Sequence, residues 1–283
     1  MSELRYNIIS GEWIILATER AKRPKDFIKE KKEQNLPEYK ENCPFCPGNE
    51  SQTPIETFRL GDANRWKVRS VYNKFGAVSS EEKKERHIRG LYNSINGFGM
   101  HEVIIEHPLH NKVTALMTNE EIENILNVYK ARYTAISKMQ GIECIVIFKN
   151  HGPSAGTSLE HPHSQLIATP VVPPQIRSRL ERAASFFDFN GKCVFCAMLE
   201  SELKERTRIV LETEHFVAFM PYAAFSPFAT WIFPRRHSVS FADINKEEIS
   251  DLAKNLKTTL SKLYYGLDNP DFNYSIRSIP VGE

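Results

Sequence analysis

The sequence predicts an α+β protein built from two similar halves, each with a small antiparallel sheet and one main helix. Two observations indicate this class. The same order of segments occurs twice along the 283 residues: a Cys-x-x-Cys pair, strand-like stretches, a helix-like stretch and a further β-rich run. Two prolines in VVPPQ (171–175) interrupt both helix and sheet, which places the boundary between the halves there. We therefore expect halves at residues 1–172 and 173–283.

The first half contains two strand-like stretches, WKVRSVYNKFGAV (66–78) and HEVIIEHPLH (101–110), the second with partly alternating apolar and polar residues. A helix is predicted to follow, because Thr118 and Glu121 have the spacing of a capping box. Its apolar stripe consists of Ile122, Ile125, Leu126, Tyr129, Tyr133 and Ile136. The β-rich run CIVIFKN (144–150) then leads to a histidine motif.

The second half repeats this order. Its strand-like stretches are HFVAFMPYAAF (215–225) and FATWIFPRRH (228–237). Asp243 is predicted to cap a helix that ends near Gly266. The apolar stripe of that helix consists of Ile249, Leu252, Leu256, Leu260 and Leu263. FNYSIRSIP (272–280) corresponds to CIVIFKN of the first half.

Composition and charge exclude several classes of protein. The 41% hydrophobic and 25% charged residues are ordinary for a globular chain, and a net charge of +2 provides no strong field for nucleic acid or a membrane surface. The N-terminal stretch MSELRYNIISGEWIIL lacks the pattern of a signal peptide. We therefore expect a cytoplasmic protein without nucleic-acid or membrane partners.

Four of the five cysteines form two Cys-x-x-Cys pairs, which in a reducing compartment indicate metal ligands or a redox dithiol. Cys43 and Cys46, with His110 and His161, would complete a tetrahedral Cys2His2 zinc site. A thioredoxin-like dithiol has the same spacing. The zinc interpretation is favoured because each pair is followed by a histidine at the end of a strand-like stretch. Cys144 stands alone among apolar residues and is expected to be a buried apolar side chain.

Cys193, Cys196 and His237 form a second candidate zinc site with three ligands. In the first half the fourth ligand follows the third after 51 positions, and the same step from His237 passes Glu283. The repeat thus predicts either an open site or a longer natural chain that supplies the missing ligand, and we favour the longer chain.

The motif EHPHSQ (160–165) holds two histidines around a proline. If this segment is a strand, His161, His163 and Gln165 share one face. His161 could then bind metal while His163 stands beside it. Neutral imidazole is a good nucleophile toward phosphorus, and Gln165 could donate a hydrogen bond to a phosphate oxygen.

The preceding segment, NHGPSAGTS (150–158), supplies Gly156 and Ser158, small residues that would let backbone N–H groups approach a phosphate. His101 and His107 flank a strand and are expected at the surface or beside a ligand, rather than as ligands. The alternative to a catalytic site is a zinc-stapled fold whose spare histidine only packs.

HPHSQ, NHGPSAGTS and WIILATERAKRP (13–24) together resemble the galactose-1-phosphate uridylyltransferase family of the histidine-triad superfamily, over almost the whole chain. The resemblance implies two histidine-triad-like halves and a structural zinc at the first Cys2His2 set. It implies that His163 forms a nucleotidyl-histidine intermediate and that Gln165 stabilises it. The residues that would line the nucleotide and phosphate site are Arg20, Arg23, Asn73, Asn150 and Ser158.

The implied reaction is ping-pong: His163 takes UMP from UDP-glucose and passes it to galactose 1-phosphate. Two positions differ from the family pattern. Lys74 replaces an acidic residue found near the uridine in some members, and Ser164 replaces a glycine of the well-known bacterial enzymes. Plant ADP-glucose phosphorylases share that serine and also carry two Cys-x-x-Cys zinc sites. An adenylyltransferase that splits ADP-glucose with phosphate is therefore one alternative, and a non-catalytic zinc-stapled nucleotide-binding protein is another. A homodimer is an expected assembly.

Overall fold

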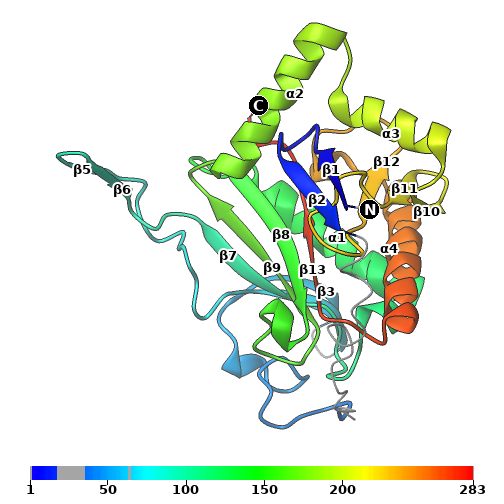
Figure 1. Ribbon diagram of the computed structural model, residues 1–283. Coiled ribbons are helices and arrows are strands. Elements are labelled where there is room, and N and C mark those ends of the chain that lie inside the picture. Colours follow the sequence, from blue (N-terminus) through cyan, green and yellow to red (C-terminus); the bar gives the residue numbers. More distant parts are fainter. Residues whose placement is uncertain (1, 18–35, 63–64, 283) are drawn as a thin grey trace. The chain divides into compact units, whose positions relative to one another are not determined.

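The computed structural model describes residues 2–17, 36–62 and 65–282. The chain forms two compact units, each made of two stretches (Figure 1). The first unit comprises Met1–Asn35 and Pro174–His237, and the second comprises Leu36–Pro173 and Ser238–Glu283. Helices and antiparallel sheets occur together, which confirms the α+β class. The division into halves at residue 172 stays a prediction.

A six-stranded antiparallel sheet organises the second unit, in the order β13-β8-β9-β7-β4-β3. Its strands are β3 (Glu56–Asp62), β4 (Arg65–Tyr72), β7 (Met100–Ile105), β8 (Cys144–His151), β9 (His163–Thr169) and β13 (Phe272–Ile276). The last of these extends the sheet by pairing with β8, an association that the sequence pattern did not predict. The predicted strands in CIVIFKN and FNYSIRSIP are thus neighbours in one sheet (Figure 1).

Helix α1 (Asn119–Ile136) packs against this sheet and against α4 (Lys246–Gly266). The predicted capping box of α1 is confirmed, since Thr118 Oγ1 accepts from the Glu121 N–H and the Glu121 carboxylate accepts from the Thr118 N–H. All six residues of the predicted apolar stripe are buried. This helix thus covers the sheet as its apolar period requires.

Helix α4 ends at Gly266 as predicted, but the prediction of Asp243 as its cap is wrong. Asn245 is the N-cap, and it forms a complete capping box with Glu248. Asp243 instead lies in the short 3-10 helix η5 (Phe241–Asp243). The Asn245–Glu248 capping box satisfies two N–H groups at the start of the helix, whereas Asp243 alone could satisfy one. The capping box therefore sets the start of α4.

The rest of the second unit consists of short elements. The hairpin of β5 (Arg86–Arg89) and β6 (Tyr92–Ile95) stands away from the sheet (Figure 1). The 3-10 helices are η2 (Glu50–Gln52), η3 (Thr114–Leu116) and η4 (Pro153–Ala155). Cys144 is 5% exposed, which confirms its prediction as a buried apolar side chain.

The first unit contains a hairpin, two helices and a three-stranded antiparallel sheet of order β10-β11-β12. Its elements are β1 (Ser2–Tyr6), β2 (Trp13–Ala17), α2 (Pro174–Asn190), α3 (Val194–Glu205), β10 (Ile209–Glu212), β11 (Phe216–Phe219) and β12 (Trp231–Pro234). Leu199, Val217 and Phe219 form its core cluster. Among the residues that the structure describes, no helix is long and apolar enough to span a membrane.

Candidate active site and metal centres

Strand β9 carries the two side chains predicted to act in catalysis. It begins at His163, so the condition considered for EHPHSQ, that the whole motif is a strand, holds only from His163 onward, and His161 precedes the ladder. The physical reason is Pro162, which has no N–H to donate to a neighbouring strand. His163 and Gln165 still share one face of β9, while Ser164 between them is buried on the other.

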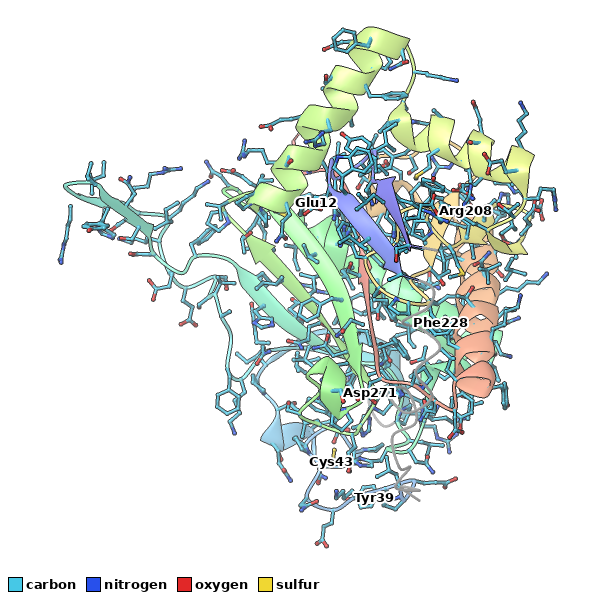
Figure 2. All side chains as sticks on the ribbon, viewed as in Figure 1. Glu12, Tyr39, Cys43, Arg208, Phe228 and Asp271 are labelled. Carbon is cyan, nitrogen blue, oxygen red and sulfur yellow. The ribbon has the colours of Figure 1, made fainter. Side chains whose placement is uncertain are left out.

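The four predicted ligands of the first metal site come together beside this strand. Cys43, Cys46, His110 and His161 each place one ligand atom within 4.8 Å of the others, and all four are buried. Cys43 Sγ lies 3.8 Å from His161 Nδ1, and Cys46 Sγ lies 3.6 Å from His110 Nδ1. These separations suit two ligands on one tetrahedral ion with bonds of about 2.3 Å to sulfur and about 2.0 Å to nitrogen. Cys43 lies on the loop before η2 (Figure 2). The predicted clustering is confirmed, and the donor set fits a zinc ion.

His161 is oriented for metal binding by its own hydrogen bond. Its Nε2 donates to the main-chain carbonyl of His107 across 2.7 Å, which leaves Nδ1 facing the two sulfurs. Burial lowers the pKa of His161 to about 3, so the ring is neutral and its lone pair is available. His107 was predicted at the surface or beside a ligand. Its main-chain carbonyl accepts the hydrogen bond that orients the ligand His161. The neighbouring residue Glu160 accepts a hydrogen bond of 3.1 Å from the Lys40 ammonium group.

The second predicted metal cluster also assembles. Cys193, Cys196 and His237 place their ligand atoms within 4.8 Å of one another, and Cys196 Sγ lies 3.3 Å from His237 Nδ1. Cys193 is the N-cap residue of α3, so the Cys-x-x-Cys pair spans the first turn of that helix. Three convergent donors fit a metal whose fourth ligand comes from elsewhere.

One ring nitrogen of His163 is engaged in a hydrogen bond, and no described residue hydrogen-bonds the other. Its Nδ1 donates to the main-chain carbonyl of His161 across 2.8 Å, so the lone pair resides on Nε2. Burial lowers the pKa of His163, which favours the neutral ring. Phe45 packs edge-on against the same ring, with 5.6 Å between ring centroids. The imidazole is thus held in the protonation state and tautomer that a nucleophile requires.

A buried ion pair supports the backbone at His163. Lys149 donates to the His163 carbonyl across 3.1 Å and to Glu106 across 2.5 Å. Tyr129 donates to the other Glu106 oxygen across 3.1 Å and lies 2.9 Å from the Tyr274 hydroxyl. Burial raises the pKa of both phenols, so both stay protonated. This network was not predicted, because its only signal in the sequence is one lysine and one glutamate within β-rich runs.

Gln165 lies in a second polar cluster, with Asn73 and His101. Its Oε1 is 2.9 Å from His101 Nε2 and 3.3 Å from Asn73 Nδ2. The predicted substrate-binding residue Asn73 therefore meets the predicted catalytic residue Gln165. His101 was not predicted to join them. In the β7–β9 register, His101 is opposite Ile167 and Val103 is opposite Gln165, so His101 and Gln165 are diagonal neighbours.

The predicted phosphate-binding segment forms a tight turn between β8 and His161. Gly152 and Gly156 have φ values of 85° and 90°, conformations that glycine adopts readily. Asn273 Nδ2 donates to Asn150 Oδ1 across 2.7 Å and to the Ala155 carbonyl across 2.9 Å, so β13 holds the turn. Gly156 and Ser158 are both exposed. Their predicted phosphate-binding role stays a prediction. Arg20 and Arg23 lie outside the described residues.

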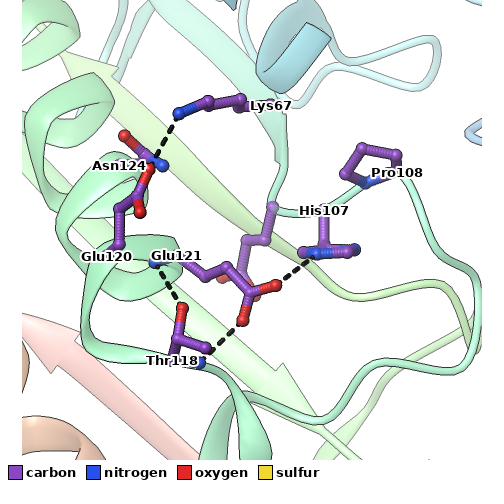
Figure 3. Close-up of a pocket in the computed structure, with 8 residues that line it drawn as sticks. Lys67, His107, Pro108, Thr118, Glu120, Glu121 and Asn124 are labelled. Carbon is purple, nitrogen blue, oxygen red and sulfur yellow. Dashed lines mark hydrogen bonds and ion pairs between the residues drawn. The ribbon is translucent and has the colours of Figure 1, made fainter. Parts of the chain in front are cut away.

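A cavity of about 280 Å³ lies at the N-terminal end of α1 (Figure 3). The residues that line it are Lys67, Glu106, His107, Pro108, Thr118, Glu120, Glu121 and Asn124. Its polar groups bind one another: His107 Nε2 lies 2.9 Å from Glu121, and Lys67 donates to Glu120 across 2.9 Å. The hydrogen bond between His107 and Glu121 thus joins the start of α1 to the segment that follows β7.

Comparison with known proteins gives two family matches that together span nearly the whole chain. The N-terminal domain of galactose-1-phosphate uridyl transferase matches residues 1–173, and the C-terminal domain of the same family matches residues 179–279. An ADP-glucose phosphorylase of Arabidopsis thaliana is 38% identical over 99% of this chain and 79% of its own length. A galactose-1-phosphate uridylyltransferase of Thermotoga maritima is 32% identical over 97% of this chain and 79% of its own length.

Solved structures of proteins from the same family have the same fold as this chain. The crystal structure of an ADP-glucose phosphorylase from Arabidopsis thaliana with bound ADP-glucose superimposes with a TM-score of 0.85 at 36% identity, covering 100% of this chain and 84% of that one. A uridylyltransferase structure gives a TM-score of 0.76 at 27% identity, over 100% and 82% of the two chains. The sequence motifs, the fold and these matches lead to one conclusion: the chain belongs to the galactose-1-phosphate uridylyltransferase family.

Proposed function

We propose that the protein is a nucleotidyltransferase in which His163 accepts a nucleoside monophosphate from a nucleoside diphosphate sugar. The observation that carries this proposal is the hydrogen bond of 2.8 Å from His163 Nδ1 to the His161 carbonyl. It leaves the Nε2 lone pair for attack. Formation of the Nε2–P bond would break the bond from the α-phosphorus to the bridging oxygen, and the sugar 1-phosphate would leave with that oxygen. A phosphate oxygen of the acceptor would then displace the neutral imidazole.

Gln165 is proposed to donate a hydrogen bond to a non-bridging oxygen of the transferred phosphoryl group. It lies two residues after His163 on the same face of β9. Such a donor stabilises the charge that develops during phosphoryl transfer more strongly than it stabilises the substrate. Asn73, Asn150, Gly156 and Ser158 are proposed to bind the nucleotide and its phosphates.

We propose ADP-glucose as the donor and inorganic phosphate as the acceptor, the alternative that the sequence left open. The support is similarity to an ADP-glucose phosphorylase at 38% identity, together with the serine at position 164. UDP-glucose with galactose 1-phosphate, the first expectation, remains the second candidate because several relatives are uridylyltransferases, one at 32% identity.

Zinc is the proposed metal at both cysteine pairs. At the first site Cys43, Cys46, His110 and His161 would hold it, and the bound ion would act structurally. By fixing His161 it would fix the carbonyl that orients His163. Thiolate ligands at both sites suit a reducing compartment, in line with the expected cytoplasmic location.

The test is incubation of the protein with ADP-glucose or UDP-glucose without acceptor, followed by intact-mass measurement. One added AMP would support the first donor, and one added UMP the second. The adduct should be absent from His163→Ala protein that retains its metal. A metal-loaded, folded wild-type protein without an adduct from any nucleoside diphosphate sugar would instead indicate a non-catalytic binding protein. Release of free nucleoside monophosphate would indicate a hydrolase.

A further inference from the structure

A short turn, Asn73 to Ala77, is connected to His101 and to the Asn73 side chain by three backbone donors. The Asn73 N–H donates to the His101 carbonyl across 2.8 Å. The Ala77 N–H donates to His101 Nδ1 across 3.0 Å. The Phe75 N–H donates to Asn73 Oδ1 across 2.9 Å. A backbone N–H can only donate, so His101 Nδ1 and Asn73 Oδ1 must be hydrogen-bond acceptors.

The tautomer of His101 follows from the contact with Ala77. Because Nδ1 accepts a hydrogen bond, a neutral ring carries its proton on Nε2. That nitrogen lies 2.9 Å from Gln165 Oε1 and therefore donates to it. The hydrogen bond from the Ala77 N–H thus places the imidazole proton on Nε2. That proton in turn requires the oxygen of the Gln165 amide, rather than its NH2 group, to face His101.

Asn73 supplies a second donor to the same oxygen. Since its Oδ1 accepts from the Phe75 N–H, its Nδ2 is the donor that lies 3.3 Å from Gln165 Oε1. The 3.2 Å between Asn73 Nδ2 and His101 Nε2 is the separation of two donors that converge on one acceptor. A flipped Gln165 would bring its NH2 group against both donors and lose both hydrogen bonds.

We propose that His101 is a positioning residue for nucleotidyl transfer, because it holds the Gln165 amide with its NH2 group directed away from β7 and available to a phosphoryl oxygen. No residue among the described ranges 2–17, 36–62 and 65–282 accepts a hydrogen bond from that NH2 group. The inference rests on the proposed function, since it assigns the phosphoryl group as the missing acceptor. His101 itself acts only through Gln165.

The test compares rates of nucleotidyl-His163 formation in single turnovers with the donor sugar nucleotide. His101→Phe keeps a planar ring without a donor, and should lower the rate constant about tenfold. Gln165→Ala should lower it by about a hundredfold or more. Adding His101→Phe to Gln165→Ala should change the rate by less than about twofold, because the two residues act as one unit. A rate equal to wild type in His101→Phe, or independent losses in the double variant, would overturn the proposal.

Two conservative variants separate positioning from folding. His101→Gln retains an NH2 donor near the place of Nε2 and should recover a rate within about threefold of wild type. His101→Asn retains an acceptor for Ala77 but does not reach Gln165, so it should be as slow as His101→Phe. Equal rates in these two variants would contradict the proposal. His87→Phe, on the exposed β5–β6 hairpin, is the matched control for the substitution itself.

A readout without turnover distinguishes this inference from the proposed function. Histidine ¹H–¹⁵N correlation spectra of the full-length, metal-loaded protein near neutral pH should assign the Nε2-protonated tautomer to His101. The Nδ1-protonated tautomer would overturn the inference even if the enzyme transfers nucleotides. Absence of any His163 adduct in wild-type protein, with the expected tautomer present, would instead overturn the proposed function and with it the assignment of a phosphoryl acceptor.

Discussion

The ammonium nitrogen of Lys149 lies 2.5 Å from a Glu106 carboxylate oxygen, and the two residues are 2% and 1% exposed. The same ammonium group donates to the main-chain carbonyl of His163, so the ion pair is joined to the backbone of the proposed nucleophile. Two opposite charges that are both buried depend on each other, because either one alone would be buried without compensation.

Removing one member of this pair should therefore lower the free energy of unfolding more than removing both. Lys149→Met is expected to lower the free energy of unfolding by about 3–5 kcal/mol, and Lys149→Met with Glu106→Leu by clearly less. Urea denaturation of the two variants and wild type measures this difference. The exposed pair of Lys67 and Glu120 offers a control, since Lys67→Met should cost at most about 1 kcal/mol. A double variant less stable than Lys149→Met would contradict this account.

The stability contributed by Glu56 should depend on pH. Burial favours the neutral carboxyl, but hydrogen bonds and charge from Arg59 and Arg69 outweigh it and hold the pKa of Glu56 below its usual range. A depressed carboxyl pKa stabilises the fold above the unfolded-state pKa of about 4.3, and this stabilisation is lost as the pH falls through the lower, folded-state pKa.

The measurement is the melting temperature of wild type and Glu56→Gln between pH 7 and pH 3. Wild type should be the more stable of the two near neutral pH, and the difference should shrink as the solution becomes more acidic than the unfolded-state pKa. Loss of metal at low pH affects both proteins, so the difference between them isolates Glu56. A difference that is constant over the whole range would show that its charge is not responsible.

Cys43→Ser should remove the metal of the first site and lower thermal stability, because binding of a structural metal contributes directly to folding. Elemental analysis and thermal unfolding of the same preparation test both effects. Cys144→Ala is the matched control, since Cys144 is buried but belongs to neither cluster. Full metal content in the Cys43→Ser protein would remove this residue from the ligand set.

Gly152→Ala should be destabilising by about 1–3 kcal/mol, because its φ of 85° strains any residue with a Cβ. The added methyl would also stand 2.0 Å from Asp271 Oδ1. Gly90→Ala is the control, with a φ of 62° and no atom within 4 Å of the added Cβ, so it tests backbone conformation alone. Equal losses of unfolding free energy in the two variants would show that the contact with Asp271 contributes nothing.

Features whose chemistry is local or specified by residue type were predictable from the sequence. The capping box and apolar stripe of α1 depend on residues within a few positions of one another, and both were predictable. The first metal cluster was predictable because two thiolates and two imidazoles are a donor set that suits a tetrahedral zinc site. The cap of α4 was misplaced because two acidic or amide side chains, Asp243 and Asn245, compete within three positions.

The alignment of the strands depends on tertiary contacts, and this alignment assembles the rest of the site. His101 meets Gln165 because of the register between β7 and β9, and Lys149 is opposite Tyr274 because β13 pairs with β8. A one-residue change of register would turn each of these side chains to the other face of the sheet. Strand partners and register arise from contacts between residues distant in sequence, so the pattern of a single chain does not determine them.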